Sequence, residues 1–246
     1  MLSCINFTKG CEKLEFLQNI SQDFYKNIIA QQRYLFFWNG LKATIAMALI
    51  AIVIGVPIGM IIALIKNSAK ENKKLRWAEI ICNLYVNLIR GTPVVLQLMI
   101  IYYIIFRSSN ISSILVGGLA FGINSGAYVS EIVRGGIESV DKGQMEAGRS
   151  LGFNRSQTMR MIILPQAIKN ILPSLGNEFI MLIKETSVAG YIGILDITKA
   201  SDIVASRTYN YFFPLTVAAC IYLVLTLGLS KLIRIFERRM AKSDNR

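Results

Sequence analysis

Five apolar stretches, each long enough to cross a bilayer, recur along this chain of 246 residues. A transmembrane helix needs about 20 consecutive apolar residues, and we assign the spans to about 41–65, 78–106, 111–132, 171–192 and 212–233. The second lies in an apolar stretch that begins at Leu75 and is interrupted by RGTP at 90–93. The fourth contains Glu178, Lys184 and Glu185. The pattern predicts an all-α membrane protein with five transmembrane helices.

The first forty residues are more polar than the spans. Three acids interrupt any apolar core there, so we do not expect a cleavable signal peptide; they are Glu12, Glu15 and Asp23. Apolar residues at helical spacing predict a helix on the membrane surface, and a partly ordered leader is an equally good interpretation. These residues are Leu14, Leu17, Ile20, Phe24 and Ile28. We therefore divide the chain into an extracytoplasmic or interfacial segment at 1–40, a transmembrane domain at 41–235 and a tail at 236–246.

Lysine and arginine are concentrated in alternate connections. The stretch 66–79 carries five of them, 134–169 six, and 231–246 six, whereas 193–211 carries two. Loops rich in lysine and arginine stay in the cytoplasm. The N-terminus is therefore predicted outside and the C-terminus inside, although the first forty residues carry four such residues against the rule.

Composition supports a membrane class. The chain is 53% hydrophobic and 17% charged, whereas soluble domains carry about 25% charged residues. The net charge of +12 fits cytoplasmic loops better than a nucleic-acid partner. There is no histidine, and the four cysteines lack C-x-x-C spacing, so we expect neither a zinc site, nor another metal or cofactor, nor a histidine base.

Small residues recur at every fourth position on two of the spans. On the first they are Ala51, Gly55, Gly59 and Ala63, and on the third Gly118, Gly122, Gly126 and Ser130. Ridges of small residues let helix backbones approach closely within lipid. The two ridges predict a compact bundle.

A polar passage, GQMEAGRSLGFNRSQTMRMIILPQA at 143–167, separates the third and fourth spans. It predicts a short helix at Glu146–Leu151, a sharp turn at Gly152, and a second helix from Ser156 to Pro165. Such a loop, at 141–165 on the cytoplasmic side, suits docking of a soluble partner; a merely solvated loop is the alternative.

Charged residues within a span mark a functional path, because the bilayer otherwise rejects them. Glu178 and Glu185 lie two helical turns apart and share a face with Met181, whereas Lys184 lies on its flank. Lys184 could neutralise one carboxylate as an internal ion pair, and Arg90 could form an ion pair with the other. We expect these side chains to face a substrate.

The RGTP interruption, Arg90, Gly91, Thr92 and Pro93, predicts a break in the second span. Thr92 is expected to cap a half-helix at Val94–Phe106, with Pro93 at its first position. Backbone N–H groups near Val94 would then carry partial positive charge toward an anionic group, and Gln97 would be a neutral contact. A purely structural kink is an equally good interpretation.

Several motifs, in order, resemble the binding-protein-dependent ABC importer permeases. The family's cytoplasmic EAA motif is matched by Glu146, Ala147, Gly148, Gly152, Ile162, Leu164 and Pro165. RGTPVVLQL at 90–98, AYVSEIVRGGIESV at 127–140 and GNEFIMLIKETS at 176–187 resemble the polar amino-acid branch of that family. The resemblance runs from about Trp38 to Met240. Gly148 departs from it, because the family usually has a second alanine there.

The resemblance implies a transporter subunit in the bacterial inner membrane, and not an enzyme. Its implied partners are two ATP-binding cassette subunits, a second permease copy, identical or paralogous, and an extracytoplasmic substrate-binding protein. The sequence has no G-x-x-x-x-G-K-[ST] phosphate loop, so ATP hydrolysis would belong to the partner subunits. Arginine or another cationic amino acid is slightly favoured as substrate, with glutamine, histidine and cystine as alternatives. A stand-alone, ion-coupled secondary transporter is the competing function.

Overall fold

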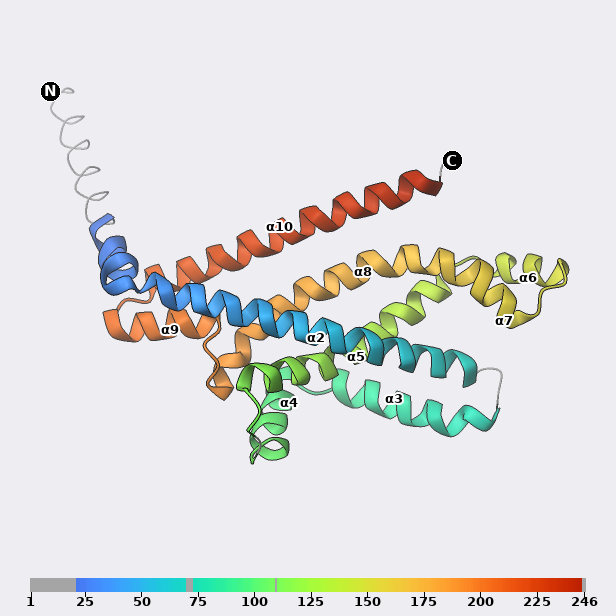
Figure 1. The fold of residues 1–246 in the computed structure, drawn as a ribbon, viewed down its shortest axis with the longest axis horizontal. Coiled ribbons are helices and arrows are strands. Elements are labelled where there is room, and N and C mark those ends of the chain that lie inside the picture. Colours follow the sequence, from blue (N-terminus) through green and yellow to red (C-terminus); the bar gives the residue numbers. More distant parts are fainter. Residues whose placement is uncertain (1–20, 70–72, 109, 245–246) are drawn as a thin grey trace, which may run out of the picture.

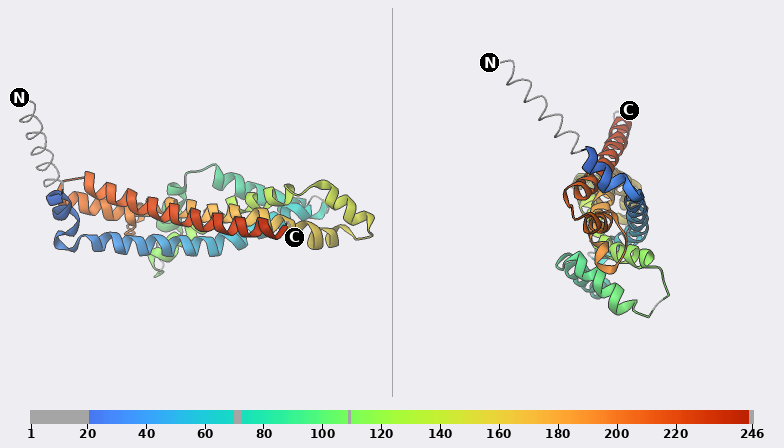
Figure 2. Two further views of the ribbon diagram at one scale, coloured as in Figure 1. Left: turned by 90° about the horizontal axis from the view of Figure 1, so that it is seen from above. Right: turned by 90° about the vertical axis from the view of Figure 1, so that its left-hand side faces the viewer.

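A computed structural model describes residues 21–69, 73–108 and 110–244, and the regular elements within these ranges are helices. The α-helices are α2 (Tyr34–Ala69), α3 (Arg76–Arg90), α4 (Val94–Ile100), α5 (Ser113–Glu138), α6 (Lys142–Ser150), α7 (Arg155–Thr158), α8 (Leu164–Glu185), α9 (Ile197–Thr208) and α10 (Phe212–Asp244). Segments with 3-10 or π geometry are η1 (Tyr25–Ile29), η2 (Ala30–Gln32), η3 (Lys73–Leu75), η4 (Ile101–Ile105), η5 (Met159–Ile163) and η6 (Thr186–Ile192). Most helices run along the long axis of the molecule (Figures 1 and 2).

The helices confirm an all-α membrane fold. In the described part of the chain, α2, α5 and α10 are each long and apolar enough to cross a membrane, and α3 with the α4–η4 segment forms a fourth candidate. The fourth predicted span corresponds to α8, whose charged residues lower its hydropathy and which packs against α2, α5 and α10. Helix α10 continues through the predicted tail to Asp244, because the lysine, arginine and glutamate residues there are good helix formers.

The second predicted span is bent at RGTP. Helices α3 and α4–η4 meet at 108°, and α4 points away from the long axis in Figure 1. The half-helix expected after the break is present, but its capping differs from the prediction. Pro93 is the N-cap and not the first helical residue, while the Thr92 hydroxyl donates back to the Leu88 carbonyl over 2.8 Å. Thr92 therefore closes α3 instead of capping α4.

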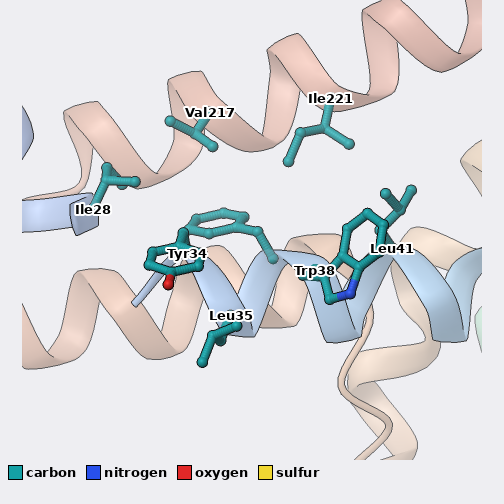
Figure 3. Close-up of a pocket in the computed structure, with 8 residues that line it drawn as sticks. Ile28, Tyr34, Leu35, Trp38, Leu41, Val217 and Ile221 are labelled. Carbon is teal, nitrogen blue, oxygen red and sulfur yellow. The ribbon is translucent and has the colours of Figure 1, made fainter. Parts of the chain in front are cut away.

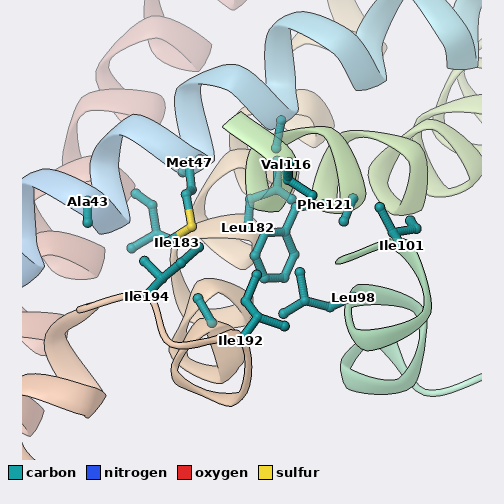
Figure 4. Packing of buried hydrophobic residues seen from close by; sticks show 14 residues of the cluster. Ala43, Met47, Leu98, Ile101, Val116, Phe121, Leu182, Ile183, Ile192 and Ile194 are labelled. Atoms are coloured by element: carbon teal, nitrogen blue, oxygen red, sulfur yellow. The ribbon is translucent and has the colours of Figure 1, made fainter. Parts of the chain in front are cut away.

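The two ridges of small residues, from which a compact bundle was predicted, face each other. A Cβ added to Gly55 would lie 3.0 Å from Ser125 Cβ, and one added to Gly122 would lie 3.2 Å from the Ala51 carbonyl oxygen. Helices α2 and α5 thus pack backbone to backbone along most of their length. Beside this contact, Met47, Phe121 and Leu182 lie in a buried cluster that joins α8 to the pair (Figure 4).

The lysine- and arginine-rich stretches lie at one end of the molecule. The C-terminal ends of α2 and α10 and the α6–α7 segment are all found towards this end, and η1 and α9 lie at the other (Figure 1). At that other end, Ile28 is buried against α9 and α10, and Phe24 stacks edge-on against Phe213 at 6.2 Å. The predicted surface helix is described only from residue 21; Leu14, Leu17 and Ile20 lie outside the described residues.

Candidate functional site

Helix α6 is capped at both ends by residues that directly flank it. The Asp141 carboxylate caps the start by accepting a hydrogen bond from the Gly143 N–H over 2.6 Å. At the other end the Phe153 N–H donates to the Gly148 carbonyl over 3.2 Å, a closure that needs a left-handed residue between them. Gly152 supplies it with φ +88°. The predicted short helix and sharp turn are therefore present.

The second helix of this segment begins at a capping box. The Asn154 side chain accepts from the Gln157 N–H, and the Gln157 side chain accepts from the Asn154 N–H, both over 2.9 Å. This helix was expected to end at Pro165, but the chain continues through η5 and α8 as far as Glu185. Pro165 lies at the start of α8, directly after the π-type turn η5, so its missing N–H falls where the hydrogen-bond pattern changes from π to α.

Helices α6 and α7 pack through a glycine. Gly148 is buried, and an added Cβ would lie 3.0 Å from Thr158 Oγ1 and still closer to Thr158 Cγ2. Thr158 is itself fully buried. Other side chains of α6 and its C-cap are open to the surroundings: Glu146 and Ala147 are exposed, and Leu151 is 77% exposed. We call these three residues the α6 surface.

A buried carboxylate lies between α5 and α8. Glu178 is 7% exposed, and its Oε1 accepts a hydrogen bond from Ser125 Oγ over 2.7 Å. Glu185 is half-buried on the same helix, whereas Met181 and Lys184 are exposed. No carboxylate of the described chain lies within 4.0 Å of the Lys184 ammonium. The internal ion pair considered for Lys184 is therefore not formed.

The Gln97 side chain is hydrogen-bonded to residues at the RGTP break. Its Nε2 lies 2.8 Å from the Ile89 carbonyl oxygen and 2.7 Å from Thr92 Oγ1, and its Oε1 accepts from Asn124 Nδ2 over 2.8 Å. Gln97 thus joins the end of α3, the start of α4 and the middle of α5. Val94, which was also expected to face substrate, packs against the buried cluster of Figure 4.

Arg90 belongs to a cluster that sequence reasoning missed. Its guanidinium lies 3.8 Å from Glu131 of α5, which also binds Lys66 of α2 at 3.0 Å and Arg134 at 2.8 Å. One carboxylate therefore links three helices, and Arg90 is not the partner of Glu178 or Glu185. The i,i+3 spacing of Glu131 and Arg134 was visible in the sequence, but Lys66 joins them only through the fold. No group of three potential metal ligands occurs among the described residues.

Comparison with known proteins gives a consistent result. Residues 55–242 match the family described as binding-protein-dependent transport system inner membrane component. A putative glutamine transport system permease protein, GlnP, of Rickettsia felis is 42% identical over 85% of this chain and 94% of its own length. The arginine transport system permease protein ArtQ of Bacillus subtilis is 37% identical over 85% and 94%.

Solved structures show the same fold. A chain from the crystal structure of an amino acid ABC transporter with histidines superposes with a TM-score of 0.76 at 45% identity, covering 84% of this chain and 94% of that one. A chain of the inward-facing MetNI methionine ABC transporter superposes with a TM-score of 0.66 at 20% identity, covering 87% and 98%. At that identity the second likeness concerns the fold alone.

Proposed function

Because the chain belongs to the family of binding-protein-dependent transport system inner membrane components, we propose that it is the permease subunit of an ATP-driven importer for polar amino acids. Relatives named as glutamine and arginine permeases support this substrate class. The proposed assembly contains two permease copies and two ATP-binding cassette subunits in the bacterial inner membrane. An extracytoplasmic binding protein delivers the amino acid.

The α6–α7 segment carries this proposal. It lies at the end of the molecule with most lysine and arginine residues (Figure 1), which we place in the cytoplasm with the C-terminus, leaving the N-terminus outside. There the α6 surface offers Glu146, Ala147 and the exposed Leu151 to an ATP-binding cassette subunit. The chain contains no phosphate loop of its own, so the energy for import comes from that partner.

The geometry transmits movement from α6 to the interior. The contact of Gly148 with Thr158 and the capping box fix α6 against α7, and α7 continues through η5 into α8. Packed helices move as rigid bodies between discrete arrangements. A displacement of α6 by the ATPase is therefore carried along α8 to Glu178 and Glu185.

We assign the substrate path to the α8 face that carries these two carboxylates. An amino acid has an ammonium for one of them, and a cationic side chain could use the other, which favours arginine-like substrates. Exposed Met181 and Lys184 lie beside them. Gln97 is assigned to the break in place of the substrate, because both polar atoms of its amide already have partners within the chain.

Coupling is tested by importing amino acid into proteoliposomes with the complete transporter. Gly152→Pro fixes φ near −65° against the required +88°, and Glu146→Lys reverses the charge of the α6 surface. We expect both variants to assemble yet to lose ATP-dependent import, whereas Ser156→Ala, an exposed residue of α7, imports normally. Normal import by both variants would refute the docking role of α6. Import without any ATPase subunit would instead favour the ion-coupled secondary transporter.

Substrate class is tested by thermal stabilisation of the purified complex with each of the twenty amino acids and with cystine. A bound ligand raises the melting temperature by mass action. We expect one chemical class to stabilise the complex, and Glu178→Gln or Glu185→Gln to abolish that shift. An intact complex that responds to none of them would assign selection to the binding protein and a structural role to the carboxylates.

A further inference from the structure

An open apolar groove separates α2 from α10 at the end of the molecule opposite α6. One cavity of about 550 Å³ is lined by Trp38 and Leu41 of α2 and by Val217 and Ile221 of α10, among other side chains (Figure 3). A second cavity of about 480 Å³ shares Leu41, Val217 and Ile221 and extends to Val224. The two cavities therefore form one continuous groove along the start of α10.

The groove exists because α10 packs poorly here. Its apolar stretch is only 11% buried, although exposed apolar surface of this extent needs a covering. In a membrane protein that covering is either acyl chains or another protein. The choice between them depends on what lies at the mouth of the groove.

The mouth is aromatic and cationic. Tyr34 and Trp38 are 45% and 54% exposed, and exposed tyrosine and tryptophan mark the level of lipid headgroups. The Lys42 ammonium lies 5.3 Å from the centre of the Trp38 ring. Arg33, which directly precedes Tyr34, is already held within the chain, because its Nη1 donates to the Lys26 carbonyl over 2.6 Å and its Nη2 to Gln31 Oε1 over 2.9 Å.

Lys42 lacks an acidic partner. Among the described residues, no carboxylate lies within 4.0 Å of its ammonium. Lys42 lies at the end of the molecule that the distribution of lysine and arginine places outside, where the positive-inside rule disfavours positive charge. An apolar groove with an unpaired cation beside a tryptophan that lines it has the chemistry of a site for an anionic amphiphile.

We propose that this groove binds an anionic phospholipid, with an acyl chain between α2 and α10 and the phosphate held by Lys42. The site rests on the membrane setting of the proposed permease but not on its coupling to ATP. A second copy of the chain fits less well, since a two-fold contact through this surface would bring the Lys42 side chains of both copies together. Like charges disfavour such a contact.

The two tryptophans of the chain make the test selective. Trp38 lines the groove, and Trp77 is exposed near the start of α3. The full chain is purified in detergent as Trp77→Phe, which leaves Trp38 as the reporter, and as Trp38→Phe, which leaves Trp77. Phosphatidylglycerol or phosphatidylcholine with brominated acyl chains is then titrated, because bromine quenches tryptophan fluorescence on contact.

We expect Trp38 to be half-quenched at about fivefold less brominated phosphatidylglycerol than phosphatidylcholine, because a single cation contributes about 1 kcal/mol. Trp77 should show no such preference. Lys42→Gln, made with Trp77→Phe, should remove the preference of Trp38, whereas Lys231→Gln, farther along α10, should not.

Three outcomes overturn the proposal. Equal quenching of Trp38 by both lipids shows ordinary boundary lipid, and a preference that survives Lys42→Gln shows that the assigned headgroup contact is wrong. Trp38 that resists quenching by either lipid, in a chain that sediments as a dimer, shows that a second copy fills the groove. Each of these results leaves the importer function untouched, because import is measured separately.

Discussion

The Ser125 hydroxyl on α5 lies 2.7 Å from Oε1 of Glu178 on α8. The backbone of Gly55 on α2 also packs closely against the Ser125 side chain. The serine therefore lies where the close α2–α5 contact meets the helix that carries the candidate substrate carboxylates. It both separates two helices by the size of its side chain and supplies the hydrogen bond of the buried acid.

Ser125→Ala should destabilise the transporter. It leaves a carboxylate that is 7% exposed without its hydrogen-bond donor, at an expected cost of about 1–3 kcal/mol in the free energy of unfolding. Ser206→Ala is the matched control, because that hydroxyl is exposed and bonds only its own helix. Thermal melting of the purified complex measures both. Equal melting temperatures for the two variants would show that Glu178 does not depend on Ser125.

Gly148→Ala should loosen the α6–α7 segment, although alanine is the better helix former and is what the family usually has at this position. The added Cβ would collide with Thr158 Cγ2. Thr158→Ser removes that methyl group and keeps a hydroxyl, so the double variant should recover the ATP-dependent import that Gly148→Ala loses. Gly135→Ala is the control, since a Cβ there meets nothing within 4 Å. If Gly148→Ala alone imports normally, the packing of α6 on Thr158 does not matter for coupling.

Patterns local in sequence predicted much of the fold. The glycine ridges predicted a compact bundle because their spacing is a property of one helix, although not that α2 and α5 pack on each other. Gly152 marked a turn because glycine tolerates positive φ. The helix end predicted at Pro165 was wrong, because the meaning of a proline depends on the residues that follow it. A proline at a helix start and one just beyond a helix end look alike until the following turn is known.

Contacts between distant segments were not predictable from one sequence. Lys66 and Glu131 are 65 residues apart, and nothing in the pattern of either segment names the other. Gln97 was predicted as a neutral contact for substrate, whereas its hydrogen bond with Asn124 depends on how α5 passes α4. Periodicity shows which face of a helix is buried, and not which polar group it meets there.

Gln97→Leu should destabilise the break at RGTP. It removes the amide that bridges the Ile89 carbonyl, Thr92 and Asn124, and each buried group left unpaired costs about 1–3 kcal/mol. We expect a lower melting temperature with and without amino acid. Met99→Leu, exposed on the same helix, should melt like the parent. An unchanged melting temperature combined with weaker substrate binding would return Gln97 to the substrate path.

Asp196, between η6 and α9, should make stability depend on pH. It is fully buried, and burial raises the pKa of its carboxyl above the usual value, although the N–H groups of Thr198 and Lys199 donate to it. The Tyr222 hydroxyl faces it from α10 at 3.5 Å. Lys199 directs its ammonium to Asp202 instead, over 2.7 Å.

The sign follows from the raised pKa. Between the unfolded pKa of about 3.9 and the higher folded one, the native state holds a proton that the unfolded state has lost, so this group stabilises the fold as the pH falls through that window. The melting temperature of the parent should therefore rise relative to Asp196→Asn as the pH is lowered from neutrality towards the unfolded pKa of about 3.9. Asparagine still caps α9, so the two proteins differ mainly in the charge at this position. Asp202→Asn, which changes an exposed acid on the same helix, should show the same dependence of melting temperature on pH as the parent. If Asp196→Asn also shows the parent's dependence, the buried carboxyl has an ordinary pKa and is charged throughout.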